Sequence, residues 1–344
     1  MNRSRRQETL ATSLPVLPGE AVVATAFGHP SRGQVVCPSA ALLGGALRRR
    51  GLDVRYAPFA ATAEGAVPVR AVTYLGRDET PSGLAVACRA DVEAEVAACA
   101  EVMRTRRIVL GAPDPRCEGA REHGAQAAGL CPLALSARDE VLRFASRGDT
   151  VLVVGREGHA VLPVLLDAAP PGGVLLVEDV GGVHDVRIDD PARVAVVLQP
   201  GLPVEDTGSV AVALRERFPL LVPQDPKTVC YAASDRRSTI RELASFCDAL
   251  IVAGAPDPED TALHAAGMIP LHFAAGPEDI RPEWLAGTAS VGITAARGAD
   301  PALARELAAA LTGLGPAAAV ERRVGTVELS PVTPSSTTIP GRRT

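Results

Sequence analysis

Three cysteines at near-even spacing constrain the fold more than any other feature of the chain. Cys37, Cys131 and Cys230 stand 94 and 99 residues apart, and each lies where a strand pattern gives way to a helix pattern. Because each interval is about the length of one small α/β unit, the spacing predicts three similar modules that each deliver one thiolate to a shared centre. Three thiolates on one iron–sulfur cluster would leave its fourth iron open to a substrate.

Short β-branched runs alternate with helical stretches rich in Ala, Leu and Arg along the chain. Continuous apolar strands with helical crossovers indicate an α/β fold with mostly parallel sheets covered on both faces. The strand runs are EAVVATAF (20–27), RIVLGA (107–112), TVLVVG (150–155), GVLLVED (173–179), RVAVVLQ (193–199), DALIVAGA (248–255) and ASVGITAA (289–296). The pentapeptide GAPDP follows two of these strands, as a ligand loop or as an ordinary turn.

The module boundaries follow from these patterns and from the composition of the two ends. Both ends are predicted to be disordered tails, and the carboxyl end is rich in Pro, Ser, Thr and Arg. The predicted segments are a tail over 1–18, modules over 19–129, 130–222 and 223–317, and a second tail over 318–344.

Composition and charge exclude several classes of function. The chain is 47% hydrophobic and 22% charged, which is typical of a soluble globular protein. A net charge of −5 and few aromatic residues argue against nucleic-acid binding. The amino terminus lacks an apolar signal region and no apolar run reaches the length of a membrane span, so a cytoplasmic protein is expected. Its seven cysteines contain no CxxC pair, which argues against a zinc ribbon or a thioredoxin-type site.

Four segments carry a family resemblance. They are CPLALSARDEVLRFASRGDTVLVVGREGH (131–159), RVAVVLQPGLPVEDT (193–207), RERFPLLVPQDPKTVCYAASDRR (215–237) and PEDIRPEWLAGTASVGITA (277–295). In order and spacing, the stretch from 129 to about 312 resembles the 4-hydroxy-3-methylbut-2-enyl diphosphate reductase family, the last enzyme of the non-mevalonate isoprenoid route. RGQVVCPSAALLGGAL (32–47) resembles the family's amino-terminal cysteine motif only loosely, with two extra residues before the cysteine.

The resemblance implies three α/β modules around a pseudo-threefold axis and a [4Fe–4S] cluster held by Cys37, Cys131 and Cys230. It also implies that two electrons and two protons remove an allylic hydroxyl as water, which gives isopentenyl and dimethylallyl diphosphates. The electrons would come from an external donor such as ferredoxin or flavodoxin. Cys117 is the rival third ligand, while the other three cysteines, Cys88, Cys99 and Cys247, lie in helical patterns and are expected in the core.

The resemblance also implies the substrate contacts. His159 falls on the second histidine of the family's GHxGHPE loop, so it is the candidate catalytic and diphosphate-binding residue, although a lone histidine after a strand is often an ordinary surface residue. The other substrate-binding candidates are Arg156, Gln199, Thr261 and Arg297. Both arginines suit phosphate, because a guanidinium binds phosphate oxygens in a bidentate manner.

Several family positions are changed in this chain. The glutamate that delivers protons is replaced by Val161, and only Glu157 on the same loop offers a carboxylate. Pro200 and Gly201 replace two threonines, and a serine- and asparagine-rich loop becomes the acidic DPEDT (257–261). The cluster positions are therefore kept, while the substrate pocket is altered.

Three interpretations remain open from the sequence. The first is a reductase of this family, with the ordinary substrate or a changed one. The second is a non-catalytic paralogue that keeps the fold and serves as a redox sensor or partner subunit. The third is a cluster-free α/β protein that binds a small molecule, in which the cysteines are core residues.

Overall fold

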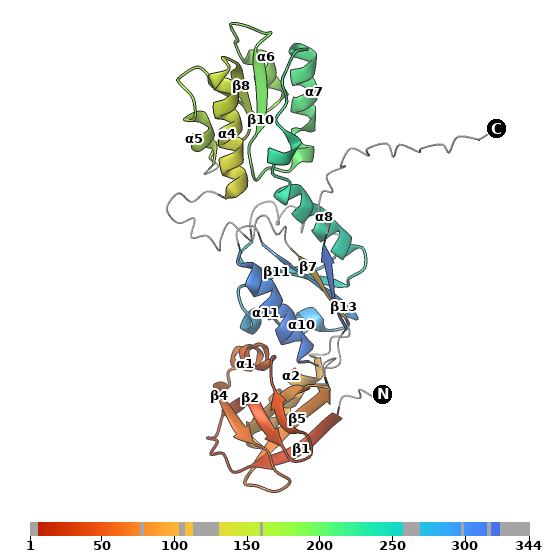
Figure 1. The fold of residues 1–344 in the computed structure, drawn as a ribbon. Coiled ribbons are helices and arrows are strands. Elements are labelled where there is room, and N and C mark those ends of the chain that lie inside the picture. The colour runs from red at the N-terminus through yellow and green to blue at the C-terminus, as the bar shows by residue number, and fades with distance from the viewer. Residues whose placement is uncertain are drawn as a thin grey trace, which may run out of the picture.

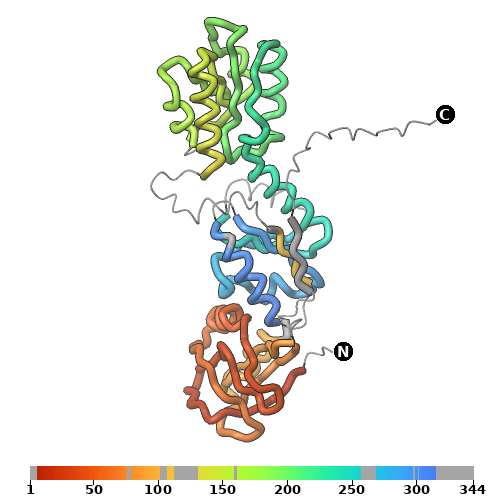
Figure 2. Tube along the Cα trace, viewed as in Figure 1, coloured from red at the N-terminus to blue at the C-terminus, as the bar shows by residue number. Residues whose placement is uncertain are grey.

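Within the described residues, the strands form three sheets of six, three and five strands. The computed structural model describes residues 6–75, 79–102, 107–112, 131–158, 161–256, 269–296, 299–314 and 318–323. Figures 1 and 2 show the three sheets in a row, with the amino-terminal six-stranded sheet at one end and the five-stranded sheet in the middle. The predicted α/β class with mostly parallel sheets is confirmed, because the second and third sheets are parallel throughout.

The first sheet differs from the others because most of its pairings are antiparallel. Its elements are β1 (Arg6–Thr12), β2 (Glu20–His29), β3 (Gly33–Val36), α1 (Ala40–Arg49), β4 (Asp53–Ala60), β5 (Val67–Leu75), β6 (Pro81–Cys88) and α2 (Glu93–Val102). The strand order is β1-β5-β6-β3-β2-β4. Only three residues join β2 to β3, and such a short connection closes an antiparallel pair, whereas a parallel pair needs a long crossover. The first module is therefore not a copy of the other two.

The second sheet is parallel, in the order β10-β8-β9. Its module contains α4 (Pro132–Ser146), β8 (Thr150–Val154), α5 (Leu162–Leu166), β9 (Val174–Val177), α6 (Val180–Asp185), β10 (Val194–Leu198), η2 (Val204–Thr207) and α7 (Gly208–Arg217). Ala137, Val141 and Phe144 follow the helical period on α4 and are fully buried in one core with β8 and β10. These elements span residues 132–217.

The third sheet is parallel, in the order β12-β11-β13-β7-β14. Its elements are β7 (Arg107–Ala112), η3 (Pro226–Thr228), α8 (Ala232–Ala244), β11 (Ala249–Ala253), β12 (Leu271–Ala274), η4 (Pro277–Asp279), α10 (Pro282–Leu285), β13 (Ser290–Ala295), α11 (Pro301–Thr312) and β14 (Ala318–Arg323). The sequence pattern assigns β7 to the first module, but it pairs with β13 and β14. Ile108 and Val109 on β7 are both fully buried, and α8 and α11 cover the two faces of this strand.

Two segments expected in the tails form strands. Arg6–Thr12 pairs along its whole length with β5, from Arg6 opposite Thr73 to Thr12 opposite Val67. Ala318–Arg323 pairs with β7 in parallel. Both strands lie at sheet edges, where pairing with one neighbour is enough to satisfy half of the backbone hydrogen-bonding groups.

The first and third modules share one continuous apolar core. Leu42 and Leu47 of α1 lie in the same buried cluster as Ile280, Leu285 and Leu311. The cores around α4 and α7 are instead built from residues of the second module alone. The molecule therefore contains one composite body made of two modules, and a second module with its own core. In the described part of the chain, no helix has the length and apolar character needed to cross a membrane.

Candidate functional site

The loops that follow β8 and β10 lie side by side at the carboxyl end of the second sheet. Gln199 directly follows β10 and is only 2% exposed. Its side-chain Oε1 accepts a hydrogen bond of 3.0 Å from the backbone nitrogen of Arg156. Gly155 permits this approach, because a Cβ at that position would lie 2.4 Å from the same oxygen. Within the described residues, the buried Nε2 of Gln199 has no hydrogen-bond partner.

The loop after β8 is also fixed to β9. The backbone nitrogen of Glu157 donates to Oε1 of Glu178 at 2.8 Å, and Gly158 turns the chain with a φ of +79°. The Arg156 side chain is exposed at this edge. Val161 stands at the N-cap of the short helix α5 and packs against the apolar core of the second module. The valine at this position is therefore a packing residue.

Cys131 caps the amino end of α4. Its backbone is extended and Pro132 occupies the start of the helix, so the Cys-Pro pair sets the point where the helix begins. The Cys131 Sγ accepts a hydrogen bond of 3.4 Å from the backbone nitrogen of Ala134. Because α4 leads directly into β8, its amino end lies at the carboxyl end of that strand. The sulfur therefore lies at the same edge as Arg156 and Gln199, in a position where the helix dipole favours negative charge.

Cys230 is carried to the same edge by the segment that runs beside β10. Val222 bridges Ala195 in parallel, and Gln224 Oε1 accepts a hydrogen bond from the backbone nitrogen of Leu198 at 2.9 Å. The chain then passes through η3 and reaches Cys230, which is 8% exposed, just before α8.

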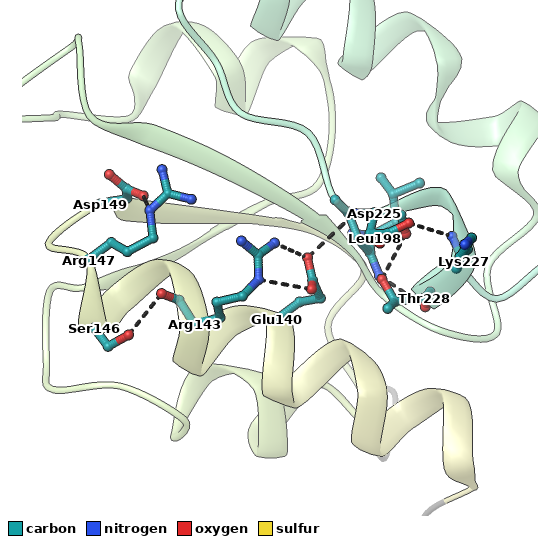
Figure 3. Close-up of polar contacts among 10 residues, drawn as sticks. Glu140, Arg143, Ser146, Arg147, Asp149, Leu198, Asp225, Lys227 and Thr228 are labelled. Carbon is teal, nitrogen blue, oxygen red and sulfur yellow. Dashed lines mark hydrogen bonds and ion pairs between the residues drawn. The ribbon is translucent and has the colours of Figure 1, made fainter.

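Glu140 of α4 anchors this segment, as Figure 3 shows. Its Oε2 accepts hydrogen bonds from Arg143 Nη2 at 2.6 Å and from the backbone nitrogen of Asp225 at 3.4 Å. Asp225 in turn accepts a hydrogen bond of 3.0 Å from the backbone of Lys227 and so caps η3. The helix that Cys131 caps, α4, thus also holds the segment that leads to Cys230.

A polar cluster joins the second module to α8 of the third. Arg237 donates two hydrogen bonds to the Asp206 carboxylate, at 2.8 and 3.0 Å. Ser234 donates to Glu205 Oε2 at 2.6 Å and accepts from the backbone nitrogen of Val204 at 2.8 Å. These contacts fix η2, which follows the Gln199 loop, to the first turns of α8. Local sequence patterns give no sign of these roles, because the contacts of Ser234 with Glu205 and of Arg237 with Asp206 join residues 29 and 31 positions apart.

The contact between Arg237 and Asp206 should stabilise the folded protein less in acid than at neutral pH. Hydrogen bonds from Arg237 hold the pKa of Asp206 below its ordinary value of 3.8. The stabilisation is therefore present above pH 3.8 and is lost as the pH falls through the lower pKa of the folded state. Replacing Asp206 by Asn should lower the free energy of unfolding at pH 7 by about 1 kcal/mol and flatten its decline below pH 4. Chemical denaturation at several pH values tests this, with the exposed Asp167→Asn as control. A decline of unchanged steepness would contradict the prediction.

Cys37 lies at a different edge of the molecule. The amino end of α11 stands at the carboxyl edge of the third sheet, where Ala299 donates a backbone hydrogen bond to Ala296 just after β13. At the other end of α11, Ser39 donates to the carbonyl oxygen of Ala310. A helix of 12 residues is about 18 Å long, so Cys37, two residues before Ser39, lies at the opposite, amino edge. Figure 1 shows α1 beside the end of α11 that lies farther from the second module.

The three predicted ligands are therefore not brought together. Among the residues that the structure describes, no group of three or more Cys, His, Asp and Glu side chains could hold a metal ion. Cys131 and Cys230 both lie at the carboxyl edge of the second sheet, whereas Cys37 lies at the amino edge of the third sheet. His159, Thr261 and Arg297 lie outside the described residues, as does the rival ligand Cys117. Cys88, Cys99 and Cys247 are buried in the core, as expected.

Comparisons with known proteins place the chain in a family. The family model for LytB protein matches residues 107–312. The 4-hydroxy-3-methylbut-2-enyl diphosphate reductase 2 of Mycobacterium bovis is 32% identical over 213 residues, which cover 60% of this chain and 64% of the relative. The corresponding reductase of Ectopseudomonas mendocina is 32% identical over 198 residues, which cover 56% of this chain and 63% of the relative.

The chain thus spans less than two thirds of the length of these two relatives. Among solved structures, the E-1-hydroxy-2-methyl-but-2-enyl-4-diphosphate reductase from Plasmodium falciparum is 18% identical with a TM-score of 0.46, and the match covers 66% of this chain and 74% of that chain. The matched family span begins at β7 and runs through both parallel sheets to the end of α11. On this match, the chain belongs to the LytB protein family.

Proposed function

We propose that the protein is a reductase that acts on an allylic diphosphate, as the names of its relatives say of them, and that it uses an iron–sulfur cluster, as the family resemblance implies. The observation that carries the proposal is the family match over residues 107–312, which contains Cys131 and Cys230. Their common position at the edge between the second and third modules supports a shared role as cluster ligands. When bound there, an iron–sulfur cluster would pass the electrons of an external donor to the substrate.

Phosphate recognition is proposed for the loops at the same edge. The exposed Arg156 guanidinium offers a charge-assisted, bidentate contact to phosphate oxygens. The Gln199 Nε2 is a donor that finds no partner among the described residues, and a buried donor without a partner costs free energy until a ligand satisfies it. From the sequence resemblance, His159, Thr261 and Arg297 are proposed to contact the same diphosphate.

Anaerobic turnover tests the proposal. The full chain is reconstituted with iron and sulfide, reduced, and incubated with 4-hydroxy-3-methylbut-2-enyl diphosphate. Isopentenyl and dimethylallyl diphosphates are expected by mass spectrometry, and Cys131→Ser protein should form neither product. A fully loaded and reduced protein without turnover would defeat the proposal for this substrate. Allylic diphosphates with other chains then test for a changed substrate.

A second function is favoured by one observation, the valine at position 161. The family uses a glutamate there to deliver protons, whereas Val161 cannot carry a proton and packs against the core of the second module. This replacement supports a non-catalytic paralogue that binds a cluster as a redox sensor or partner subunit. A protein of this kind would take up iron and be reduced reversibly, but it would release no product.

Replacing Val161 by Glu is expected to raise the reductase rate by about 10²-fold, because a positioned general acid contributes at least that much. The side chain stands at the amino end of α5, where a carboxylate is tolerated. Val161→Gln serves as control, because a glutamine side chain has nearly the size of glutamate but cannot deliver a proton. The measurement is the single-turnover rate of reduced protein with each variant. Equal rates in the two variants would show that proton delivery does not limit the reaction.

A further inference from the structure

We infer that Cys37 is a structural thiol in the contact between the first and third modules, and that the second and third modules build the reductase site without it. This inference reverses the ligand role that the cysteine spacing predicts. Where it concerns the cluster, it rests on the proposed function. The placement of the thiol itself rests on contacts within the described residues.

Polar contacts join the first module to the third. Ser39 donates to the carbonyl oxygen of Ala310, and Tyr74 donates to that of Thr312, so two carbonyls in the last turn of α11 accept from the first module. Arg49 of α1 donates to the carbonyl oxygens of Glu278 and Ile280, at 2.5 and 2.8 Å. These donors satisfy backbone groups that a helix end and a turn would otherwise leave without partners. Ser39, two residues after Cys37, is thus one of several residues whose contacts hold the two modules together.

The Cys37 thiol lies in an apolar environment. Cys37 is 5% exposed and belongs to the apolar cluster that continues from the first module into the third. A backbone hydrogen bond from Ala85 of β6 reaches the sulfur, yet burial raises the pKa of the thiol to about 12. Cluster ligation requires the thiolate, which this apolar position disfavours. The side chain therefore behaves as a small core residue.

The third module separates Cys37 from Cys230 along the length of α11. Arg236 in α8 donates through Nε to the carbonyl oxygen of Ala295 at 3.2 Å, so the beginning of α8 lies at the carboxyl end of β13. Cys230 precedes this helix at that edge. Cys37 lies past the opposite end of α11, about 18 Å along the helix axis. Ligands of one cluster must lie within a few ångströms of each other, so Cys37 and Cys230 cannot share one.

The family match does not include the first sheet. The match begins at residue 107, so the whole of the first sheet and Cys37 lie outside it. The antiparallel pairing of that sheet also differs from the parallel sheets of the matched span. The RG-x-x-x-C segment therefore resembles the family's cysteine motif by composition alone. The first module acts as a docking partner for α11 and α10, and any further cluster ligand comes from a group other than Cys37.

Thiol labelling tests the placement of Cys37 without any cluster. The full-length, iron-free protein is reduced, treated anaerobically with iodoacetamide in its native state, and mapped by peptide mass spectrometry over time. Cys131 should react at least about tenfold faster than Cys37, because reaction needs an accessible thiolate. Cys88 is buried in the same sheet and should react as slowly as Cys37. Reaction of Cys37 at the rate of Cys131 would overturn the inference.

Iron content tests the ligand role. Cys37→Ala and its matched control Cys88→Ala should both keep the wild-type iron content after reconstitution, whereas Cys131→Ala should lose most of it. Loss of iron in a folded Cys37→Ala protein, with iron kept in Cys88→Ala, would overturn the inference. Cys37→Ser keeps an acceptor for the Ala85 amide and replaces the alanine variant if that variant does not fold. If the wild-type protein takes up no iron, the proposed function fails, and the labelling rates still decide the placement of Cys37.

Discussion

Cys131→Ser protein is expected to lose most of its iron and at least about 10²-fold of any reductase activity, while its fold stays intact. The serine hydroxyl can accept the Ala134 backbone hydrogen bond that the sulfur now accepts, so the helix keeps its cap. Cys131→Ala should lose the same iron and, in addition, about 0.5–2 kcal/mol of stability through the missing cap. Cys230→Ser should match Cys131→Ser in iron content.

The measurements are iron per protein, the visible absorption of the anaerobic protein, and the free energy of unfolding. Cys247→Ala removes a buried thiol from the core of the third module and should leave the iron content unchanged. Wild-type iron in either serine variant would contradict the assignment of both cysteines to one centre. A cluster bound elsewhere in the chain would then have to explain the iron.

Replacing Phe144 by Ala is expected to lower the free energy of unfolding of the second module by about 3–5 kcal/mol. The ring is 0% exposed and lies with Val141 on the buried face of α4, which also positions Cys131. Leu142 stands on the same helix but is 38% exposed, so Leu142→Ala should cost less than about 1 kcal/mol. The comparison separates loss of core packing from loss of helix propensity.

The two bodies can be followed separately in this experiment. Trp284, the single tryptophan, lies in α10 and packs against the core shared by the first and third modules. That core contains no residue of the second module. The urea concentration at the midpoint of the tryptophan fluorescence transition should therefore be the same for Phe144→Ala and the wild-type protein. Far-ultraviolet circular dichroism should show an early partial transition. An equal shift of both signals would indicate that the three modules unfold as one cooperative unit.

Sequence reasoning succeeded where local pattern decides structure. The parallel sheets of the second and third modules follow from apolar runs such as TVLVVG and DALIVAGA, and Cys-Pro at 131–132 marks a helix start that the structure confirms. It failed where pairing is non-local. The run 107–112 adjoins the first module in sequence, yet its partners in the sheet are β13 and β14, near the other end of the chain. An apolar strand pattern does not specify which strands lie beside it.

The candidate site likewise contains features that local patterns predict and features that depend on non-local contacts. The positions of Cys131, Arg156 and Gln199 at one edge follow from their places after strands or before helices. The contact between Asp206 and Arg237 could not be inferred from spacing, because it joins two modules across 31 residues. Even spacing of cysteines also carries no information on which end of a sheet each one reaches. The spacing therefore predicts one centre for all three cysteines, whichever edge each of them occupies.

The shared core has an energetic consequence. Because α1, α11 and one apolar interior join the first and third modules into one composite body, separating the two would expose packed side chains to water. The second module meets that body at η2 and α8 through side-chain ionic and hydroxyl contacts, which yield to salt and water far more readily than a packed core. Salt should therefore weaken the contact between the second module and this composite body before it weakens either apolar core.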